Sequence, residues 1–361
     1  MELQLPIALA GVIAEAERAV RQLNDEGGNA LAPLARLLLR TESIASSKVE
    51  GMQVGVRELA RAEARSESGM KPGATASEIL ANIDAMNLAV DHAAEAEWFG
   101  ESEIVSIHRR LFERTAQHKI AGEIRAGQNW IGGNDYTPCG ADFVPPPPES
   151  IDTLLADLCA SINDDTLPPL VQAALVHAQF ETIHPFDDGN GRTGRALVHV
   201  VLRRRGIAPQ FLPPISLIFA RAKSRYIDGL TEFRGENVIK WIEHFASATF
   251  RAAKLAQMYL DAVKNQQEIW RQQLRSVSAP PRSDSVAWMI IDQLPAHPMI
   301  SAPVAVAATK RAKSRVYEAI EQLTNAGVLL PLTDGARNRW WEASGLLDLI
   351  SQLESGELTE Q

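Results

Sequence analysis

The chain has 361 residues, enough for two or three domains with ample hydrophobic cores. A hydrophobic content of 45% and a charged content of 22% are typical of a globular protein in water, and the formal net charge of -9 argues against a chain that binds polyanions along its whole surface. Two cysteines, Cys139 and Cys159, lack the spacing of a metal site or a disulfide framework, which favours a reduced, cytoplasmic compartment. No secretory signal is visible near the start, and no apolar run approaches the length of a membrane span.

The first hundred residues are predicted to be helical. Apolar residues recur at helical spacing over 13–23, and Pro33 suits the first turn of a second helix. That helix is expected to run through residues 41–51, where Gly51 would end it. A further helix is expected over 77–90. On pattern alone, the segment before Gly51 is therefore the end of an ordinary helix.

The next part of the chain combines helices with a turn-rich segment. Helices are predicted over 103–112 and 151–163. Between them, residues 122–144 are β-prone and rich in turn residues, and they end before four consecutive prolines at 145–148. This pattern predicts an irregular hairpin followed by a stiff polyproline segment. The simplest interpretation is a surface hairpin and a connector.

The most distinctive stretch is residues 184–195, which read HPFDDGNGRTGR. Apolar residues at helical spacing precede it from Leu170 and follow it as far as Gly206, so the stretch is predicted to be a tight loop between two helices. Pro185 cannot continue the first helix, and it biases His184 away from helical geometry.

The second half of this loop suits a polyphosphate. Gly189 and Gly191 allow positive φ angles and a close approach of a ligand to the backbone. Successive amide groups entering a helix N-terminus form an anion site, and Arg192 and Arg195 lie three residues apart, where both can reach that anion. Asp188 could hold a Mg²⁺ that bridges phosphates.

His184 and Phe186 complete the interpretation of the loop. His184 titrates near neutral pH and could take a proton from an attacking hydroxyl, whereas Phe186 is expected to anchor the loop in the core. Each residue also has an ordinary explanation, because helix-end histidines often act as caps, Asp-Gly pairs are usually turns and arginines at helical spacing usually face solvent. The joint occurrence of all of them favours a functional site. The stretch matches neither the Walker loop nor the dinucleotide fingerprint.

The remainder of the chain is predicted to be a helical connector and a small C-terminal module. The expected elements are a closing helix at 238–245, a helical run to Leu274, a linker at 278–283, short helices at 286–291 and 304–308, a helix capped by Ser314 and stopped by Gly327, and a two-stranded hairpin turning at Asp334-Gly335. This order resembles a winged helix. Lys310, Arg311, Lys313 and Arg315 cluster where a recognition helix would begin, as a DNA reader would need. The alternative is a module that binds protein or dimerises.

The loop at 184–195 matches every fixed position of the Fic family signature, His-Pro-Phe-x-Asp/Glu-Gly-Asn-Gly-Arg-x-x-Arg, so the chain resembles Fic proteins. The resemblance implies a mainly α fold, in which a Fic-type helical core carries a β-hairpin flap. It also implies transfer of AMP from ATP onto a Tyr, Thr or Ser hydroxyl of a protein. By position, His184 would be the general base and Asp188 the Mg²⁺ ligand. The ATP phosphates would be bound by Gly189, Asn190, Gly191, Arg192, Thr193, Gly194 and Arg195.

The resemblance also assigns an inhibitory segment. Ser46, Glu50 and Gly51 resemble the Fic inhibitory motif Ser/Thr-x-x-x-Glu-Gly/Asn. In relatives that carry this motif, its glutamate pairs with the last arginine of the signature, which is Arg195 here. A carboxylate on that guanidinium would exclude the γ-phosphate of ATP, so transfer would be slow.

Two further segments take roles from the same resemblance. Ile131 and Gly132 are candidates for the flap that pairs with the backbone of the target protein by strand addition. Tyr226 matches the first tyrosine of a segment that lines the adenine pocket, whereas Ile227 departs from the second. A tyrosine packed on a helix is the ordinary alternative.

The predicted organisation has four parts: a helical N-terminal region with the inhibitory motif at 1–100, the Fic core at 101–250, a helical connector and linker at 251–283, and a winged helix at 284–361. We expect a cytoplasmic, self-inhibited protein adenylyltransferase that uses ATP and Mg²⁺ and modifies a target protein and itself. The alternatives are another nucleotide donor, removal of AMP, or a DNA-binding regulator whose core senses a nucleotide. The expected partners are the target protein and the nucleotide, with no membrane. A second copy of the chain, and DNA at 284–361, are candidate partners.

Overall fold

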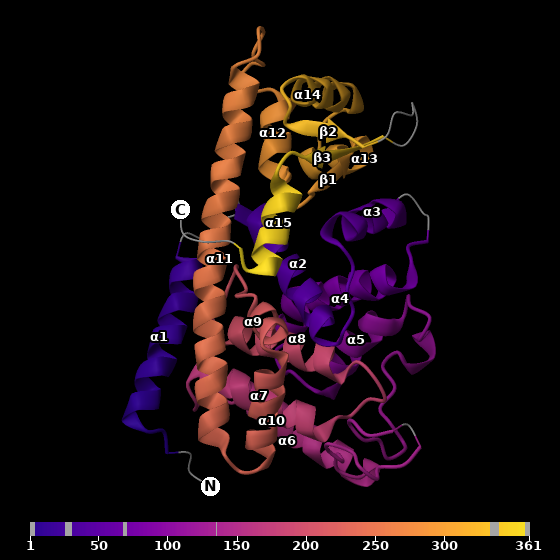
Figure 1. Cartoon of the computed structure of the whole chain (residues 1–361), viewed down its shortest axis with the longest axis vertical. Helices are drawn as coiled ribbons and strands as arrows, with labels where there is room; N and C mark the ends of the chain where they lie inside the picture. Colours follow the sequence, from indigo (N-terminus) through magenta and orange to yellow (C-terminus); the bar gives the residue numbers. More distant parts are fainter. Residues whose placement is uncertain (1–3, 26–30, 68–70, 135, 333–338, 358–361) are drawn as a thin grey trace. The chain divides into compact units, whose positions relative to one another are not determined.

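The computed structural model describes residues 4–25, 31–67, 71–134, 136–332 and 339–357. The fold is mainly α, with one small sheet, as predicted (Figure 1). The α-helices are α1 (Ile7–Asn24), α2 (Ala32–Val49), α3 (Val56–Glu67), α4 (Ala74–Asp91), α5 (Glu101–Phe112), α6 (Ile151–Asn163), α7 (Pro169–Ile183), α8 (Asn190–Arg204), α9 (Ile215–Arg221), α10 (Lys223–Arg234), α11 (Val238–Arg275), α12 (Val286–Gln293), α13 (Ala302–Thr309), α14 (Lys313–Asn325) and α15 (Leu346–Ser355). Short 3-10 helices are η2 (Ala93–Glu95), η3 (His118–Ile120) and η4 (Pro148–Ser150).

The chain folds into two compact units, each assembled from separate stretches. Unit 1 contains Met1–Glu26, Glu42–Met52 and Glu78–Lys254, and unit 2 contains Gly27–Thr41, Gln53–Ser77 and Leu255–Gln361. The divisions fall inside α2 and α11, which are each one continuous helix. The helical region that the sequence places at 1–100 is therefore shared between the two units.

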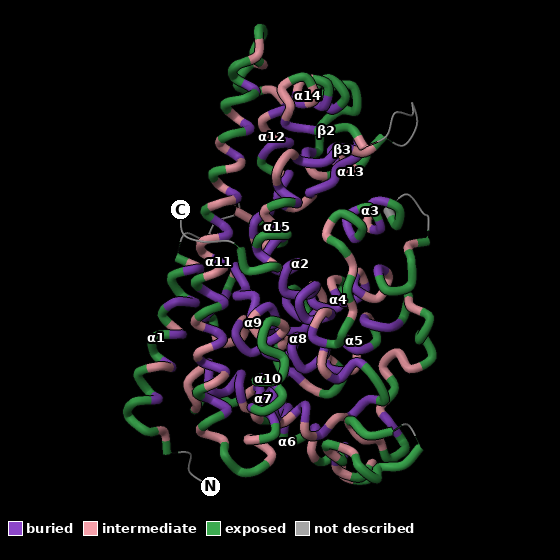
Figure 2. Tube along the Cα trace, in the orientation of Figure 1, coloured by how far each residue is buried: buried purple, intermediate pink, exposed green. Residues whose placement is uncertain are grey.

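The core of unit 1 is built around α7 and α8. Helix α7 packs against α8, α6, α1 and α10. Nearly every residue of α8 from Asn190 to Leu202 is buried, and both helices are drawn largely in the colour of buried residues in Figure 2. A helix that is buried on every side belongs to the centre of a domain. The loop that joins α7 to α8 is therefore held between two buried helices.

A short flap follows η3 in unit 1. Ile131 and Phe143 form an isolated antiparallel bridge, in which the Ile131 amide donates to the Phe143 carbonyl at 2.9 Å and the Phe143 amide donates back at 3.2 Å. The hairpin predicted over 122–144 is thus confirmed as a pairing, although it is reduced to a single bridge. We call residues 128–144 the flap.

Unit 2 contains a three-stranded antiparallel sheet in the order β1-β3-β2, with β1 (Met299–Ser301), β2 (Leu329–Pro331) and β3 (Trp340–Ala343). Ile300 is paired with Trp341 in the register of this sheet. The sequence predicted the pairing of β2 with β3 but not the third strand, β1. Helix α14 begins at Lys313 after Ala312, so the predicted capping by Ser314 is wrong, and that serine lies in the first turn. The predicted turn at Asp334-Gly335 lies outside the described residues.

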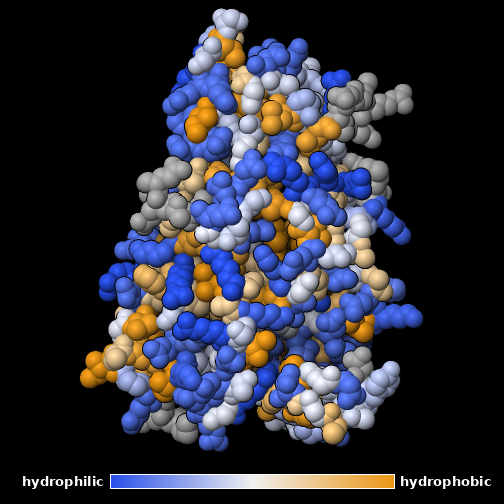
Figure 3. All heavy atoms as spheres, viewed as in Figure 1, coloured by the Kyte–Doolittle hydropathy of each residue, from blue (hydrophilic) through white to orange (hydrophobic). Residues whose placement is uncertain are grey.

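One face of the molecule is mainly polar. In the face shown in Figure 3, hydrophilic side chains predominate and hydrophobic ones lie between them in patches. Within the part of the chain that the structure describes, none of the helices is both long enough and apolar enough to cross a membrane.

Candidate functional site

The loop between α7 and α8 is fixed by its own side chains. His184 ends α7 with φ 51° and ψ 59°, a left-handed conformation, so the predicted departure from helical geometry is confirmed. Phe186 is fully buried, as predicted. The Asn190 side chain closes the loop, because its Nδ2 donates to the Phe186 carbonyl at 2.7 Å and its Oδ1 accepts from the Phe186 amide at 3.0 Å.

Gly189 is required for two separate reasons. Its φ of 77° lies in the left-handed region that side chains disfavour. A Cβ at this position would also lie 2.5 Å from Cε2 of Phe112, within the buried packing of α5. The start of α8 can therefore approach α5 closely only because position 189 carries no side chain.

His108 holds this loop from the side of α5. Its ring stacks on Phe186 with centroids 3.7 Å apart, and its Nδ1 accepts from the Gly122 amide at 3.0 Å. This leaves Nε2 as the protonated nitrogen, which lies 3.0 Å from the Asp188 carbonyl oxygen. Burial lowers the pKa of His108 to about 4, so the ring is neutral at pH 7. No local pattern around His108 indicates this role, because the stacking partner lies far along the chain.

Asp188 is held in place at the edge of the loop. Its Oδ2 accepts from Gln117 Nε2 at 3.1 Å, its Oδ1 accepts from the Gly189 amide at 2.5 Å, and Arg192 Nη2 lies 3.6 Å from Oδ1. The carboxylate side chain is 48% exposed. A single oriented and accessible carboxylate fits Mg²⁺, which takes its other oxygen ligands from phosphates and water. Among the described residues there is no cluster of three or more side chains that would hold a metal without such help.

Arg192 is a buried cation with free donors. Its side chain is 1% exposed, and its guanidinium lies 5.0 Å from the centroid of the Phe112 ring. Two of its nitrogens, Nε and Nη1, are buried with no hydrogen-bond partner among the residues that the structure describes. Burial lowers the pKa of Arg192, although Asp188 and Glu50 act in the opposite direction. Unpaired donors on a buried cation are costly, so this arrangement is suited to an anion.

Arg195, one turn further along α8, is already paired. Its Nε donates to Ser46 Oγ at 2.9 Å, and its Nη2 donates to the Ser46 carbonyl at 2.8 Å and to Glu50 Oε1 at 2.6 Å. Burial opposes ionisation of Glu50, but the Arg195 guanidinium outweighs it and the pKa of Glu50 is lowered. The Glu50 carboxylate also occupies the place that a Cβ of Gly191 would take. The structure thus brings together the glutamate and the arginine that the resemblance paired.

Buried hydrogen bonds also fix the second half of α2, which leads to Glu50. Glu42 is buried and accepts from the Ser216 amide at 2.9 Å, and its Oε1 lies 2.9 Å from His199 Nε2 on α8. Asn82 Nδ2 donates to the Ser43 carbonyl at 2.7 Å and to Ser47 Oγ at 3.0 Å. Sequence reasoning missed Glu42 and Asn82. A carboxylate and an amide among apolar helical positions were the available signals.

The His184 side chain is half-buried in a charged environment. Burial lowers its pKa to about 4, hydrogen bonding to the Glu181 backbone opposes this, and the nearby Arg234 and Arg125 lower it further. Arg125 Nε donates to the His184 carbonyl at 2.8 Å. The Glu181 carboxyl group is also buried, and burial raises its pKa to about 7. His184 is therefore a neutral imidazole at physiological pH, as a general base must be.

The remaining predicted site residues lie around this centre. Tyr226 is buried, with its hydroxyl 2.9 Å from His177 Nε2 and its ring centroid 4.5 Å from that of Phe219, whereas Ile227 is 47% exposed. The hydroxyl of Tyr226 is thus used inside the core, and a contact with adenine stays a prediction for both residues. Thr193 and Gly194 are buried in α8, and Gly51 follows α2 with φ 84°. In the flap, Ile131 is paired with Phe143, and Gly132 has φ 76°.

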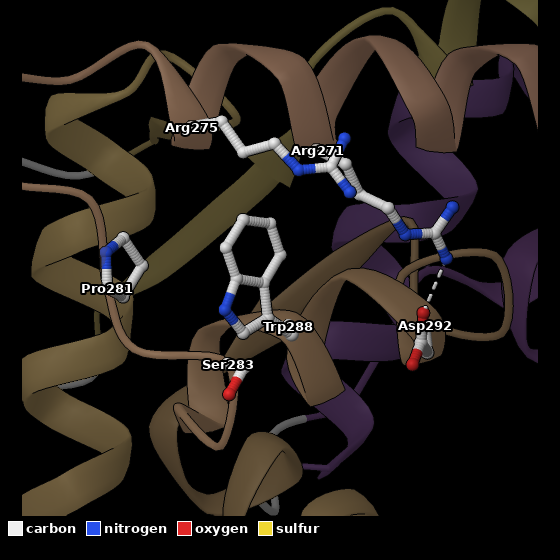
Figure 4. Close-up of a pocket in the computed structure, with 6 residues that line it drawn as sticks. All are labelled: Arg271, Arg275, Pro281, Ser283, Trp288 and Asp292. Atoms are coloured by element: carbon white, nitrogen blue, oxygen red, sulfur yellow. Dashed lines mark hydrogen bonds and ion pairs between the residues drawn. The ribbon is translucent and has the colours of Figure 1, made fainter.

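A separate hollow of about 460 Å³ lies in unit 2, between the end of α11 and the start of α12 (Figure 4). Its two arginines each have a carboxylate partner: Arg271 lies 2.6 Å from Asp292, and Arg275 lies 3.1 Å from Glu268. Because both of its arginines are already paired, this hollow is a poorer candidate for binding an anion than Arg192, which has two unpaired nitrogens. We place the candidate anion site at the α7–α8 loop.

Two family profiles match this chain. The profile of the Fic/DOC family matches residues 98–202, which include the whole α7–α8 loop, and that of the Fic/DOC family N-terminal region matches residues 11–91, which include Ser46 and Glu50. The chain belongs to the Fic/DOC family. The two matches together span just over half of the 361 residues.

Curated Fic relatives share the central part of the chain. Protein adenylyltransferase fic-1 of Caenorhabditis briggsae is 35% identical over 114 residues, which is 31% of this chain and 20% of the relative. Protein adenylyltransferase Fic of Nematostella vectensis is 32% identical over 152 residues, which is 41% of this chain and 32% of the relative. The chain therefore spans between a fifth and a third of the length of these relatives.

Solved structures of Fic proteins share the fold. A crystal structure of a Fic family protein from Desulfovibrio desulfuricans G20 has a TM-score of 0.59 at 18% identity, and the match covers 95% of this chain and 98% of that one. Fic-1 from C. elegans has a TM-score of 0.52 at 23% identity, with 69% of this chain and 72% of that chain covered.

Proposed function

We propose that this Fic protein is a protein adenylyltransferase that restrains itself through Glu50. It would transfer AMP from ATP to a Tyr, Thr or Ser hydroxyl of a target protein and of itself. The names of its curated relatives support this activity. The geometry that carries the proposal is that of Arg192, a buried guanidinium with two free nitrogens at the start of α8, beside the amides of the loop.

The chemistry follows from the placement of His184 and the phosphate-binding loop. His184 is neutral at pH 7, because burial lowers its pKa to about 4, so its ring can accept the hydroxyl proton of the target. The hydroxyl oxygen then forms a bond to the α-phosphorus, the bond from that phosphorus to the bridging oxygen breaks, and pyrophosphate leaves. Arg192 and the loop amides would stabilise the charge that develops on the phosphate oxygens.

Asp188 is the residue that would hold Mg²⁺ in this site. Gln117 and the Gly189 amide orient its carboxylate, which is nearly half exposed. Bound there with the triphosphate, Mg²⁺ would neutralise charge on the phosphate oxygens. His108 would support the same function, because its Nε2 donates to the Asp188 carbonyl and so fixes the backbone of the loop.

The proposed restraint is the Glu50–Arg195 pair. Arg195 is 2% exposed, and three of its hydrogen bonds go to Ser46 and Glu50. A carboxylate on this guanidinium takes the place that a terminal phosphate would need. The absence of a side chain at Gly191 gives the Glu50 carboxylate its room. Whatever moves Glu50 away would free Arg195 for the nucleotide.

Incubation with ATP labelled at either the α- or the γ-phosphate tests the activity. We expect the α-label on protein, weakly for the wild type, strongly for Glu50→Gly and not for His184→Ala, with no transfer of the γ-label. UTP and other nucleotides in parallel identify the donor. Release of AMP from a protein to which it was attached covalently beforehand would instead indicate the reverse reaction. No transfer of any label by Glu50→Gly would contradict the proposal.

We propose a second, separate role for residues 284–361, within unit 2, as a winged helix that binds duplex DNA. Helix α14 follows α13 and precedes the β2–β3 pair, as a recognition helix does in this fold. At its start, Lys310, Arg311, Lys313 and Arg315 are all exposed. This basic cluster supports a contact with phosphates even though the net charge of the chain is -9.

A salt series tests this role. Binding of a fluorescent duplex should weaken with salt, and the log–log slope should fall by about 1 to 2 in Lys313→Gln/Arg315→Gln, since each phosphate contact contributes about 0.9. Arg18→Gln/Arg21→Gln, which removes two charges from α1, is the matched control. An unchanged slope, or dimerisation without DNA binding, would contradict the DNA role and favour a protein-binding module.

A further inference from the structure

Arg234, the last residue of α10, lies between two parts of the site that are distant in sequence. Its guanidinium carbon lies 3.9 Å from the centroid of the Phe143 ring in the flap. Its Nη2 donates to the Glu181 carbonyl oxygen at 3.1 Å, in the last turn of α7 before His184. One side chain thus contacts both the flap and the helix that ends at the candidate base.

We propose that Arg234 is a positioning residue that couples the target-docking flap to the catalytic base. This inference rests on the proposed function, because it uses His184 as the base and the flap as the docking strand. Phe143 is the residue paired with Ile131, so the Arg234 guanidinium supports the strand pair to which a target strand would be added. On its other side, the guanidinium holds the carbonyl oxygen of Glu181, whose backbone also interacts with the His184 ring.

Arg125 has a different task, which makes the role of Arg234 specific. Arg125 donates to the His184 carbonyl at 2.8 Å, to the Gly127 carbonyl at 2.9 Å and to the Pro146 carbonyl at 2.6 Å. It therefore ties the backbone on either side of the flap to the loop. Arg234 contacts the paired side chain in the flap itself. An arginine suits this position because its planar group can stack on a ring and donate in the same plane.

The charge of Arg234 gives the coupling a measurable signature. The groups that face His184 are Arg234 from α10, Arg125 before the flap, Glu50 after α2 and the Glu181 backbone. Arg234 and Arg125 disfavour the protonated ring, whereas Glu50 and the Glu181 backbone favour it. Removal of the Arg234 charge should therefore raise the pKa of His184, and a merely structural role would not move it in this way.

Three variants separate the two contacts of Arg234. Arg234→Met removes the charge, the stacking and the hydrogen bond, whereas Arg234→Lys keeps the charge. Phe143→Leu removes the ring that the guanidinium stacks on and keeps the charge. Arg18→Gln, on α1, is the control for the loss of one arginine from unit 1.

The first measurements need no activity. NMR titration of His184 should show a raised pKa in Arg234→Met and an unchanged one in Phe143→Leu and Arg18→Gln. Hydrogen exchange at the Ile131 and Phe143 amides, which donate to each other's carbonyls, should accelerate in both Arg234→Met and Phe143→Leu. An unshifted His184 pKa together with unchanged exchange in Arg234→Met would overturn the coupling.

Activity is then measured in the Glu50→Gly background. Transfer to protein should fall by about tenfold or more in Arg234→Met and in Phe143→Leu, because small displacements of reacting groups cost that much. Affinity for ATP should change by less than about twofold. Arg234→Lys should restore the acid limb of the pH profile but not the full transfer rate. Equal losses of ATP binding and transfer would overturn the inference. If the Glu50→Gly parent itself shows no transfer, the proposed function is overturned. The NMR result then decides the coupling on its own.

Discussion

Exchange of Glu50 for glutamine should increase the affinity for ATP while leaving the affinity for ADP almost unchanged. Glu50→Gln retains the size of the side chain and an oxygen within reach of Arg195, so the change isolates the charge. In the wild type, Arg195 Nη2 lies 2.6 Å from Glu50 Oε1. In the proposed mechanism, a nucleotide with a γ-phosphate would have to displace that contact. ADP has no γ-phosphate and would not compete for Arg195 in this way.

The size of the effect follows from the geometry of the pair. A hydrogen bond between charged groups contributes about 1.5 to 3 kcal/mol. The Arg195 side chain is 2% exposed but the Glu50 side chain is 36% exposed, so solvent screening places this pair near the lower end. About 1.5 kcal/mol corresponds to about a tenfold gain in ATP affinity. Glu50→Gly, which also opens the space beside Gly191, should gain at least as much.

Titration calorimetry with Mg²⁺ and either ATP or ADP measures both affinities. Glu15→Gln, an exposed change on α1, controls for the loss of one negative charge. Equal gains for ATP and ADP would show that Glu50 acts on general charge or on folding, and that it does not compete with the terminal phosphate. No gain for ATP in either Glu50 variant would refute the competition.

Three further predictions concern the support of the loop. Gly189→Ala should lower the free energy of unfolding by about 2 to 4 kcal/mol, because the new side chain would take a left-handed φ and overlap with Phe112. Gly206→Ala should lower it by only about 1 to 2 kcal/mol, because Gly206 has φ 65° but no atom within 4 Å of its Cβ. Urea denaturation measures both. His108→Leu should raise the Mg²⁺ concentration for half-maximal transfer by about tenfold, because the Asp188 carbonyl loses its donor, and an unchanged Mg²⁺ dependence would contradict this. Glu181 has a pKa raised to about 7 by burial, so the folded state binds a proton between about pH 4.5 and 7 and the wild type loses stability as pH rises through that window. Glu181→Gln should therefore match the wild type at pH 5 and exceed it by about 1 to 3 kcal/mol at pH 8, and equal unfolding curves at pH 8 would count against a buried neutral carboxyl group.

Local signals predicted much of the helical structure. The helix predicted over 151–163 is α6, and the predicted boundaries at Gly206 and Gly327 are where α8 and α14 end, because both glycines take the positive φ of a helix stop. Strand β1 was not predicted, since its three residues are defined by their pairing with β3. A pairing across that distance leaves no periodic pattern in so short a segment.

The site shows the same division between local and distant information. Residues 184–195 could be identified because the loop carries its donors, glycines and candidate base within one short run of the chain. His108 and Arg234 could not, because each acts through a contact with a residue far along the sequence, Phe186 for one and Phe143 for the other. The division of α2 and α11 between two units was hidden for a related reason, since a continuous helix gives no local sign of a domain boundary.

The missing side chain at Gly191 has a consequence for how this protein could escape the proposed restraint. A side chain at this position would meet both the Glu50 carboxylate and the Arg195 guanidinium, the two groups of the proposed restraint. A mutation there should displace Glu50 and also crowd Arg195, so it should disturb the proposed inhibition and the proposed γ-phosphate contact together. In a genetic selection for permanently active forms, surviving changes should therefore gather at the end of α2, and the loop itself should remain untouched.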